Sequence, residues 1–541
     1  MSVHTLQQVL QQNSHLFLIE QISCFSLNIP ASTGYYQDGD FVIGGLFSLK
    51  VTLGENRSRY GFTSTMYIPD YVHAHLTKHY QHMLAMVFAI EKINKNPNIL
   101  FNMSLGFYLF NVDFNEMKAI QSSMSLLSGE SPPIPNYSCR PEKSNKLVGV
   151  IGGISTGIST QISRVLSLYN VPQISYAPFD QSLWTRVQPQ TPYQFPMSTA
   201  ALYQGIIQLL LYFSWVWIGL VAPDDMRGEL FIVDIRGEMT KYGLCVAFAE
   251  KVPELPAKST ANSHHIMKRR RMTDVIVAFG DTYSLMSFVY NIFSSYPIGN
   301  VWITTSDWDM TISPFGLSIS YTYFGGGLSF SVHMDEILGF KDFLRSVEPG
   351  KYPKDIFIGN VWSIIFECPY YNDQRFLDEL SECDQNYTLD TRPLHIWDMN
   401  TSPFSYKVHA AVYAFAEAIH EELSLRVEVD SVDEGVRPAP MPWKLHPFLK
   451  VGYLGRITDE GSVVNEEDRT TKFDIFNYQS LQDGTTALVN VGEFVFESHG
   501  VQHFFLNDEL ITWGEFYSEV SVFEVRTMGY FTEWSSSKIG P

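Results

Sequence analysis

The sequence predicts an α/β fold with two doubly wound parallel sheets. Within residues 147–222, short apolar runs at 147–151, 173–178 and 215–222 alternate with helical patterns. Parallel strands need crossover connections, which helices usually provide. The alternation continues to about residue 305, and 541 residues are too many for one ordinary hydrophobic core. We therefore expect a bilobed molecule, with two sheets joined by hinge crossings and a cleft between the lobes.

Hydrophobic periodicity assigns the first part of the chain. Residues 1–33 receive no element, and residues 52–79 are expected to form a loop. The expected strands are 41–47, 105–110, 147–151, 173–178 and 215–222. The expected helices are 80–94, 115–127, one that ends at 169, and 202–213.

The same reasoning assigns the second part of the chain. The expected helices are 229–241, 259–271, 283–294, 337–346 and 406–425. The expected strands are 244–248, 274–279, 300–305, 328–331 and 471–478, the last within an acidic, strand-rich tail. The glycine triplet 325–327 is expected to mark a crossing between the lobes, because glycine frees the backbone.

Composition and charge restrict the class of protein. Lys and Arg number 37 against 57 Asp and Glu, a net charge of −20 that argues against a nucleic-acid partner. The basic run 268–271 is expected to be a solvated helix end. The apolar stretch 206–222 is expected to be a helix followed by a strand, not a transmembrane helix. No clear signal peptide is expected, since Glu20 interrupts the apolar residues 16–19.

Cysteines and glycosylation sequons favour an oxidising, extracellular compartment. Of the five cysteines, Cys368 and Cys383 stand close together in a loop-like segment, so a bridge between them is expected there. Cys24, Cys139 and Cys245 cannot be paired by inspection. N-glycosylation sequons occur at Asn56, Asn102, Asn136, Asn386 and Asn400.

The candidate binding site lies where the parallel strands end. Ligands bind outside the carboxyl ends of such strands, often at helix N-termini. Thr156, Ala177 and residues 222–225 all lie at strand ends. The small residues around Ser155 and Thr156 allow close backbone approach, and their hydroxyl and N–H groups suit an anionic group.

Motifs for enzymes and metal sites are incomplete. Gly153–Gly157 matches G-x-S-x-G, so a serine hydrolase using Ser155 is an alternative, but an upstream oxyanion loop of HGGG type is missing. His420-Glu421 begins like a zinc-protease motif, yet Ser424 occupies the second ligand position. The expected protein is not an enzyme and has no metal site and no cofactor.

Several long strings resemble one receptor family. They span residues 38–47, 86–97, 149–153, 171–180, 213–219 and 302–309. Together these strings resemble the extracellular Venus-flytrap module of class C G-protein-coupled receptors, and most of all the vomeronasal type-2 (pheromone) branch. The resemblance covers roughly residues 35–510.

The resemblance implies a type I periplasmic-binding-protein-like fold whose lobes close on a ligand. It also implies a homo- or heterodimer that forms through lobe 1. The expected ranges are 34–197 and 329–465 for lobe 1, 198–328 and 466–517 for lobe 2, and 518–541 for a divergent tail.

The resemblance also assigns ligand contacts. Thr156 matches the hydroxyl that holds a ligand carboxylate in relatives that bind amino acids, and Ala177 matches a backbone group that holds the ammonium. The remaining positions depart from the amino-acid pattern and carry Phe179, Arg227, Ser306 with Asp307 beside it, and Phe404. Without these charge partners a free amino acid loses several charge-assisted hydrogen bonds, so a peptide, small protein or other cue is expected.

The function implied is that of a non-enzymatic chemosensory receptor region on the extracellular side of the plasma membrane. In relatives, cysteines matching Cys368 and Cys383 pair, and the position of Cys245 joins a cysteine-rich neck that leads to seven membrane helices. The sequence up to Pro541 contains neither, so a G protein is expected to be reached only through a membrane region absent from this chain. A soluble carrier or decoy that binds ligand without signalling is the second alternative.

Overall fold

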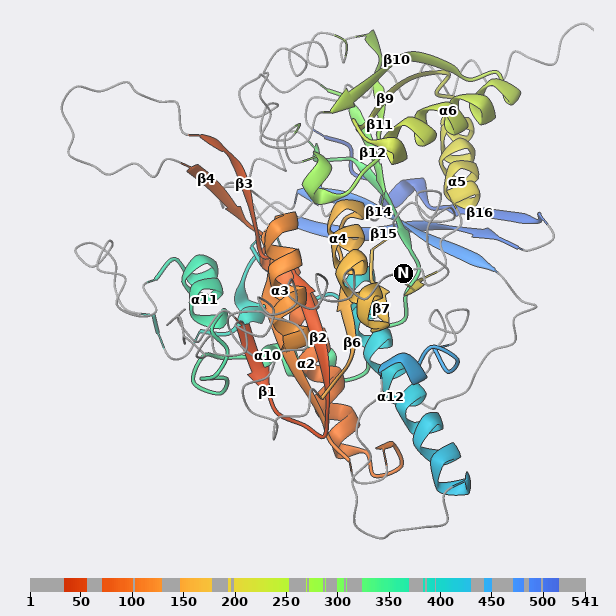
Figure 1. Cartoon of the computed structure of the whole chain (residues 1–541). Coiled ribbons are helices and arrows are strands. Elements are labelled where there is room, and N and C mark those ends of the chain that lie inside the picture. Colours follow the sequence, from red (N-terminus) through yellow and green to blue (C-terminus); the bar gives the residue numbers. More distant parts are fainter. Residues whose placement is uncertain are drawn as a thin grey trace, which may run out of the picture.

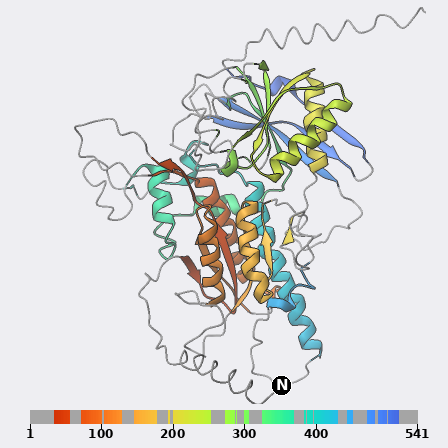
Figure 2. The same cartoon turned by 45° about the horizontal axis from the view of Figure 1, so that its top comes forward.

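The computed structural model describes part of the chain in detail. The described residues are 34–55, 71–100, 103–128, 146–177, 193–195, 199–252, 269, 272–285, 288, 299–305, 308, 324–368, 383–384, 387–394, 396–429, 442–449, 470–480, 486–497 and 500–514. They form two lobes, each built around one large sheet (Figures 1 and 2). The predicted bilobed α/β fold is confirmed.

The sheet of lobe 1 has six strands in the order β1-β5-β2-β6-β7-β8. Its bounds are β1 Gly34–Gln37, β2 Phe41–Phe47, β5 Leu105–Asn111, β6 Leu147–Gly152, β7 Gln173–Ser175 and β8 Tyr193–Gln194. All neighbours pair in parallel except β1, which runs antiparallel to β5. Parallel sheets are covered on both faces, which explains why β2 and β6 are entirely buried.

Helices cover both faces of this sheet. The helices of lobe 1 are α2 Thr77–Lys95, α3 Glu116–Ser128, α4 Thr156–Leu166, α10 Phe340–Arg345, α11 Ile358–Phe366 and α12 Pro403–Val429. Ile43 of β2 and Phe107 of β5 face the core that contains α2 and α12. Leu46 and Phe110 face the opposite core, where α3 and α4 pack. This alternation follows from the two-residue period of a strand.

The sheet of lobe 2 has eight strands in the order β10-β9-β11-β12-β13-β14-β15-β16. Its bounds are β9 Trp217–Pro223, β10 Cys245–Val252, β11 Val275–Ala278, β12 Val301–Thr305, β13 Leu328–Val332, β14 Thr471–Ser480, β15 Thr486–Phe496 and β16 Gln502–Leu506. β9 to β13 are parallel, and β14 to β16 add antiparallel strands. α5 Thr199–Tyr212 and α6 Met226–Lys241 pack on one face.

Two local predictions are wrong. Residues 52–79 are not all loop: β3 Lys50–Glu55 and β4 Tyr71–His75 form an antiparallel hairpin, and α2 begins at Thr77. The glycine triplet does not mark the crossing. Gly326 lies in a turn within lobe 2, where its N–H donates to the carbonyl of Tyr478. β13 still pairs in the lobe 2 sheet, so the crossing follows Val332, four residues beyond the expected boundary at 328.

Some predicted elements and cysteines lie outside the described residues, and others are described. The helices expected over 259–271 and 283–294 fall largely outside the described residues, as do Cys24 and Cys139. Cys368 and Cys383 form a disulfide with Cα atoms 5.1 Å apart, and Cys245 is exposed and not in a disulfide. Among the described residues, no helix is long and apolar enough to cross a membrane.

Strand β6 and helix α12 of lobe 1 approach each other closely at Gly149. A Cβ atom added there would lie 2.1 Å from the ring of Phe415 on α12. Only a glycine therefore lets α12 approach the sheet this closely. Since α12 also packs on α2, this contact sets the depth of both helices.

We expect Gly149→Ala to lower the free energy of unfolding by about 1–3 kcal/mol, as overpacking in a filled core does. Gly350→Ala is the matched control, because nothing lies within 4 Å of its added Cβ, and its effect should stay within about 0.5 kcal/mol. Urea unfolding of both variants measures this. Equal stability of the two variants contradicts the close approach of α12.

Candidate functional site

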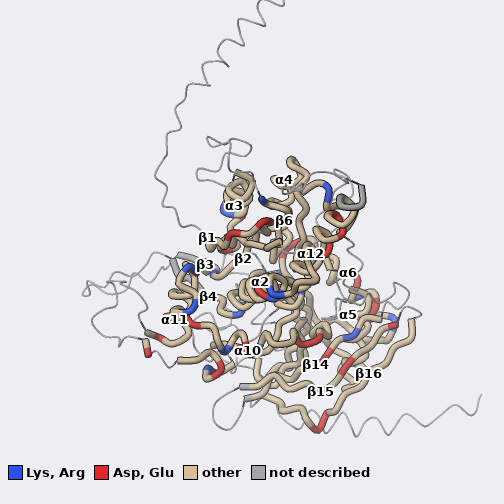
Figure 3. The backbone as a smooth tube through the Cα atoms, turned by 90° about the horizontal axis from the view of Figure 1, so that it is seen from below, with Lys and Arg blue, Asp and Glu red and all other residues tan. Residues whose placement is uncertain are grey.

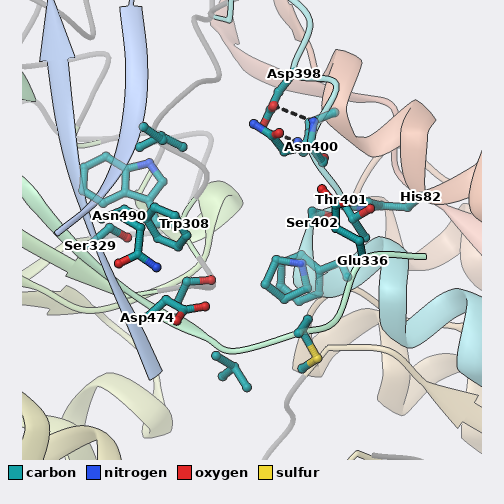
Figure 4. Close-up of a pocket in the computed structure, with 18 of the residues that line it drawn as sticks. His82, Trp308, Ser329, Glu336, Asp398, Asn400, Thr401, Ser402, Asp474 and Asn490 are labelled. Carbon is teal, nitrogen blue, oxygen red and sulfur yellow. Dashed lines mark hydrogen bonds and ion pairs between the residues drawn. The ribbon is translucent and has the colours of Figure 1, made fainter. Parts of the chain in front are cut away.

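A cavity of about 380 Å³ lies between the two lobes (Figure 4). Lobe 1 contributes the first turns of α2 and the segment from Asp398 to Phe404. Lobe 2 contributes β13, β14 and β15 together with Thr282 and Trp308. The crossing after β13 adds Met334, Asp335 and Glu336. The cavity is therefore built from both lobes and from the hinge.

The lobe 2 wall follows from strand register. Side chains two residues apart lie on the same face of a strand. The residues of β13 to β15 that line the cavity are Ser329, Ser331, Val332, Asp474, Phe476, Leu488 and Asn490. Ser329 pairs with Phe476 and Ser331 with Asp474, which brings the alternate residues of both strands together. Figure 4 shows Ser329, Asp474 and Asn490 on this side of the cavity.

The lobe 1 wall is held by a buried ion pair. Lys78 Nζ bonds Asp398 Oδ2 and the carbonyl of Asn400, the latter at 2.9 Å. Gln81 Nε2 donates to the carbonyl of Asp398 at 2.9 Å. Ser405 Oγ donates to Gln81 Oε1, joining the start of α12 to the same network. These contacts therefore hold the start of α2 against a segment that lies 320 residues further along the chain.

Two buried histidines lie at the start of α2 beside the cavity. His79 Nδ1 lies 2.8 Å from the carbonyl of Ser48, and burial lowers the pKa of His79 to about 4. Burial also lowers the pKa of His82 well below its ordinary value, and neither ring nitrogen of His82 has a hydrogen-bond partner. The His82 ring packs edge-on against Tyr176 and Phe404. Both histidines are therefore neutral near pH 7.

The helix start predicted as the binding site is well formed but does not line this cavity. Ser155 is the N-cap of α4, and its side chain accepts from the N–H of Ile158 at 3.4 Å. Thr156 is the first residue of the helix, and its buried hydroxyl oxygen has no partner. Ser175 Oγ bonds the carbonyls of Gly153 and Ala177, which brings Ala177 to this helix start.

Of the remaining predicted ligand residues, Arg227 is described and does not line the cavity. Arg227 Nη1 lies 3.5 Å from Asp281 Oδ2, and its guanidinium lies over the ring of Phe279. Phe179, Ser306 and Asp307 lie outside the described residues. Trp308, the residue after Asp307, does line the cavity.

The geometry around Ser155 does not support a nucleophile. Its hydroxyl serves the helix cap, and the two described histidines among the expected partners have contacts elsewhere. His409 is buried beside Phe88 and Tyr413, and His420 Nδ1 accepts from the N–H of Leu100. His395 lies outside the described residues.

Sequence reasoning missed most of the cavity wall. It singled out Phe404, which lines the cavity, but not Lys78, His82 or Asp474. The alternation along β14 was the available signal, since it places Asp474 and Phe476 on one face. Of the sequon asparagines, Asn400 is exposed at the cavity, while Asn56, Asn102, Asn136 and Asn386 lie outside the described residues. Within the described part of the chain, no group of three His, Cys, Asp or Glu side chains could hold a metal ion.

Comparison with known proteins assigns the chain to a family. Residues 81–480 match the family model of the receptor family ligand binding region. The chain is 67% identical over 501 residues to vomeronasal type-2 receptor 26 of Mus musculus, covering 92% of this chain and 58% of that protein. It is 27% identical to vomeronasal type-2 receptor 116 of Mus musculus, covering 81% of this chain and 51% of that protein. Identity to the extracellular calcium-sensing receptor of Homo sapiens is 23%, covering 89% of this chain and 47% of that protein.

The matches cover most of this chain but only part of each relative. The chain spans about half the length of the curated relatives it matches. The relatives are named receptors, so the prediction of a non-enzymatic receptor region is confirmed and the hydrolase hypothesis for Ser155 is wrong.

The neutral histidines predict a loss of stability in acid. An unfolded histidine titrates near pH 6.5, whereas burial lowers the folded pKa of His79 and His409 to about 4 and lowers that of His82. As pH falls from about 6.5 towards 4, these histidines bind protons in the unfolded chain but not in the native state. The free energy of unfolding therefore falls. His82→Phe should reduce this slope by up to about 1.4 kcal/mol per pH unit in urea unfolding.

The control is Val501→Phe just before β16, because Val501 is exposed and carries no titratable group. Its slope should equal that of the unchanged chain. A slope that His82→Phe leaves unaltered contradicts the neutral, buried state of His82.

Proposed function

The chain belongs to the receptor family ligand binding region, in the vomeronasal type-2 branch of class C receptors, and from this premise we propose its role. It is the extracellular ligand-binding region of a chemosensory G-protein-coupled receptor. A ligand enters the cleft between the lobes, the lobes close on it, and closure in a dimer transmits the signal.

The observation that carries this proposal is the cavity between the lobes. Its volume of about 380 Å³ lies within the range of small-ligand sites. Its walls come from both lobes, so a ligand that contacts both favours the closed arrangement over an open one. Closure is then a shift of population set by the difference in ligand affinity between the two arrangements.

Contacts between the lobes are consistent with such closure. Phe114, which follows β5 in lobe 1, stacks on Tyr283 of lobe 2 with ring centroids 4.4 Å apart. Their interplanar angle of 8° gives a flat contact that hinge motion can make or break.

We assign residues 34–197 and 333–465 to lobe 1 and residues 198–332 and 466–517 to lobe 2.

We retain the helix start of α4 as a second contact zone of the same ligand. The unpartnered hydroxyl of Thr156 is available to an anionic group, and Ala177 lies beside it. Ser155, Phe179, Arg227, Ser306 and Asp307 remain proposed contacts on the strength of the resemblance. Phe404 in place of a lysine disfavours a free amino acid, so a peptide, small protein or other organic cue is the proposed ligand.

We place this region on the extracellular side of the plasma membrane. The Cys368–Cys383 disulfide suits an oxidising compartment. Coupling to a G protein would require a membrane region joined to this chain.

Filling the cavity should abolish signalling. We propose joining this chain to the neck and membrane region of mouse vomeronasal type-2 receptor 26 and recording calcium responses of cells to a panel of peptides, amines and small proteins. Ser329→Phe places a ring in the cavity and should remove every response, because ligand entry and closure are both blocked.

His503→Phe, on the exposed edge strand β16, is the control and should respond as the unchanged chimera does. Responses that survive Ser329→Phe place the ligand elsewhere. If the isolated chain binds a ligand that never activates the chimera, the carrier function replaces the receptor function.

We propose that lobe 1 forms the dimer contact through the layer of α3 and α4. Met117 on α3 is 62% exposed, and Leu168, in the turn after α4, is 75% exposed. Large apolar side chains left in solvent on one layer suit a protein–protein contact.

Leu168→Arg should therefore weaken self-association of the chain by about tenfold or more in sedimentation equilibrium. Leu338→Arg is the control, since Leu338 is 71% exposed but precedes α10, away from this layer. A monomeric chain, or equal effects of the two variants, argues against the contact.

A further inference from the structure

We propose that the cavity between the lobes takes a ligand with one organic cation, a primary ammonium or a guanidinium, next to an aromatic or aliphatic group. This inference rests on the proposed function, since both place a ligand in the same cavity. It adds the chemical class of that ligand.

The charged groups around the cavity are mostly negative. Among the described lining residues, the carboxylates are Asp335, Glu336, Asp398 and Asp474, and Lys78 is the single Lys or Arg. Lys78 and Asp398 neutralise each other in a pair whose side chains are each 7% exposed. Among the described lining residues, the carboxylates of the hinge and of β14 therefore outnumber the Lys and Arg side chains.

Positive groups near these carboxylates have other contacts. Lys472 interacts electrostatically with Asp474 and Asp335, but its Nζ bonds Glu493 at 2.7 Å and it does not line the cavity. His333 Nδ1 lies 2.7 Å from Asp474 Oδ2, and this contact carries a full charge only when His333 is protonated. Asp335 and Glu336 lie in the crossing after β13, line the cavity and are exposed to solvent. A cationic group of the ligand can approach both of them from solvent.

The arrangement fits an organic cation better than a metal ion. A divalent metal needs several oxygen or nitrogen ligands converging on one point. No such group of three occurs among the described residues. Carboxylates spread around the cavity instead suit the several N–H donors of an ammonium or guanidinium.

His82 gives an independent indication of a polar ligand. It is 1% exposed, it lines the cavity, and neither ring nitrogen has a partner. Buried polar groups are normally hydrogen-bonded, so a ligand donor or acceptor is the expected partner. Because burial keeps the imidazole neutral, His82 does not repel a cation.

The rest of the wall is apolar and aromatic. Phe404 lies on the lobe 1 side, and Trp308, Phe476 and Leu488 lie on the lobe 2 side. Aromatic faces attract both aromatic groups and cations. The ligand's apolar part is therefore placed between these side chains, with its cation towards Asp335 and Glu336.

Three indoles that differ in charge test the proposal. Tryptamine is cationic, N-acetyltryptamine is neutral and indole-3-propionate is anionic, and binding to the full chain is measured by calorimetry and by the shift in melting temperature. Tryptamine should bind at least about tenfold more tightly than either analogue. Raising the salt concentration should weaken tryptamine binding, because surface charge attraction is screened.

Variants locate the cation. Asp335→Asn with Glu336→Gln should weaken tryptamine binding by about tenfold or more and leave the melting temperature of the free chain nearly unchanged, since both side chains are exposed. The control, Asp342→Asn with Glu348→Gln, removes the same charge from nearby exposed positions outside the cavity and should bind as the unchanged chain does.

The outcomes separate this inference from the proposed function. Equal binding of the anionic indole, equal effects of the two double variants, or stabilisation by calcium chloride in place of tryptamine overturns the organic cation. A neutral or anionic compound from the receptor panel that binds, and whose binding Ser329→Phe prevents, supports the receptor function. It contradicts the inference that the ligand is an organic cation. If no compound of either set binds, both proposals fail.

Discussion

The burial of helix α2 is the constraint on which the rest of the structure depends. Every residue from Lys78 to Ile90 is buried, between the lobe 1 sheet on one side and α10, α11 and α12 on the other. A helix placed so deeply cannot leave a charge without a partner, so Lys78 requires Asp398. That pairing draws the segment before α12 onto the first turn of α2 and creates the lobe 1 wall of the cavity. Removing either partner would leave a buried charge, at a cost of about 3–5 kcal/mol.

The lobe 2 wall depends on a different constraint, the register of β13 against β14. A shift by one residue would turn Ser331 and Asp474 away from the cavity and expose the core residues Phe330 and Phe473 in their place. The buried aromatic face of the sheet therefore fixes its polar face. The hinge leaves the sheet directly after β13, so the same register also brings Asp335 and Glu336 to the cavity. Among the described residues of the lobe 1 wall, by contrast, Lys78 is paired and the two histidines are uncharged, so this wall is nearly neutral.

Much of the fold could be predicted from the sequence, and much of the cavity could not. The strands β2 and β6 and the helix α12 follow from local patterns, because an apolar run or a helical period is visible within a few residues. The hairpin of β3 and β4 was missed because its composition resembles a loop. The cavity was missed because its members come from segments about 320 residues apart, as Lys78 and Asp398 do. Phe404 was singled out only by resemblance. The helix start of α4 was singled out because ligands generally bind outside the carboxyl ends of parallel strands.

The asymmetry of the two walls links ligand chemistry to motion. Closing an empty cavity would take the carboxylates of the hinge and of β14 out of water, and charge that is buried without a partner opposes burial. A neutral lobe 1 wall cannot compensate them. We infer that an organic cation would remove this opposition, since it would neutralise the acidic wall while its apolar part would fill the space between Phe404 and Trp308. The same groups that recognise the cation would then set the difference in free energy between open and closed lobes, which is the quantity a ligand must change in order to signal.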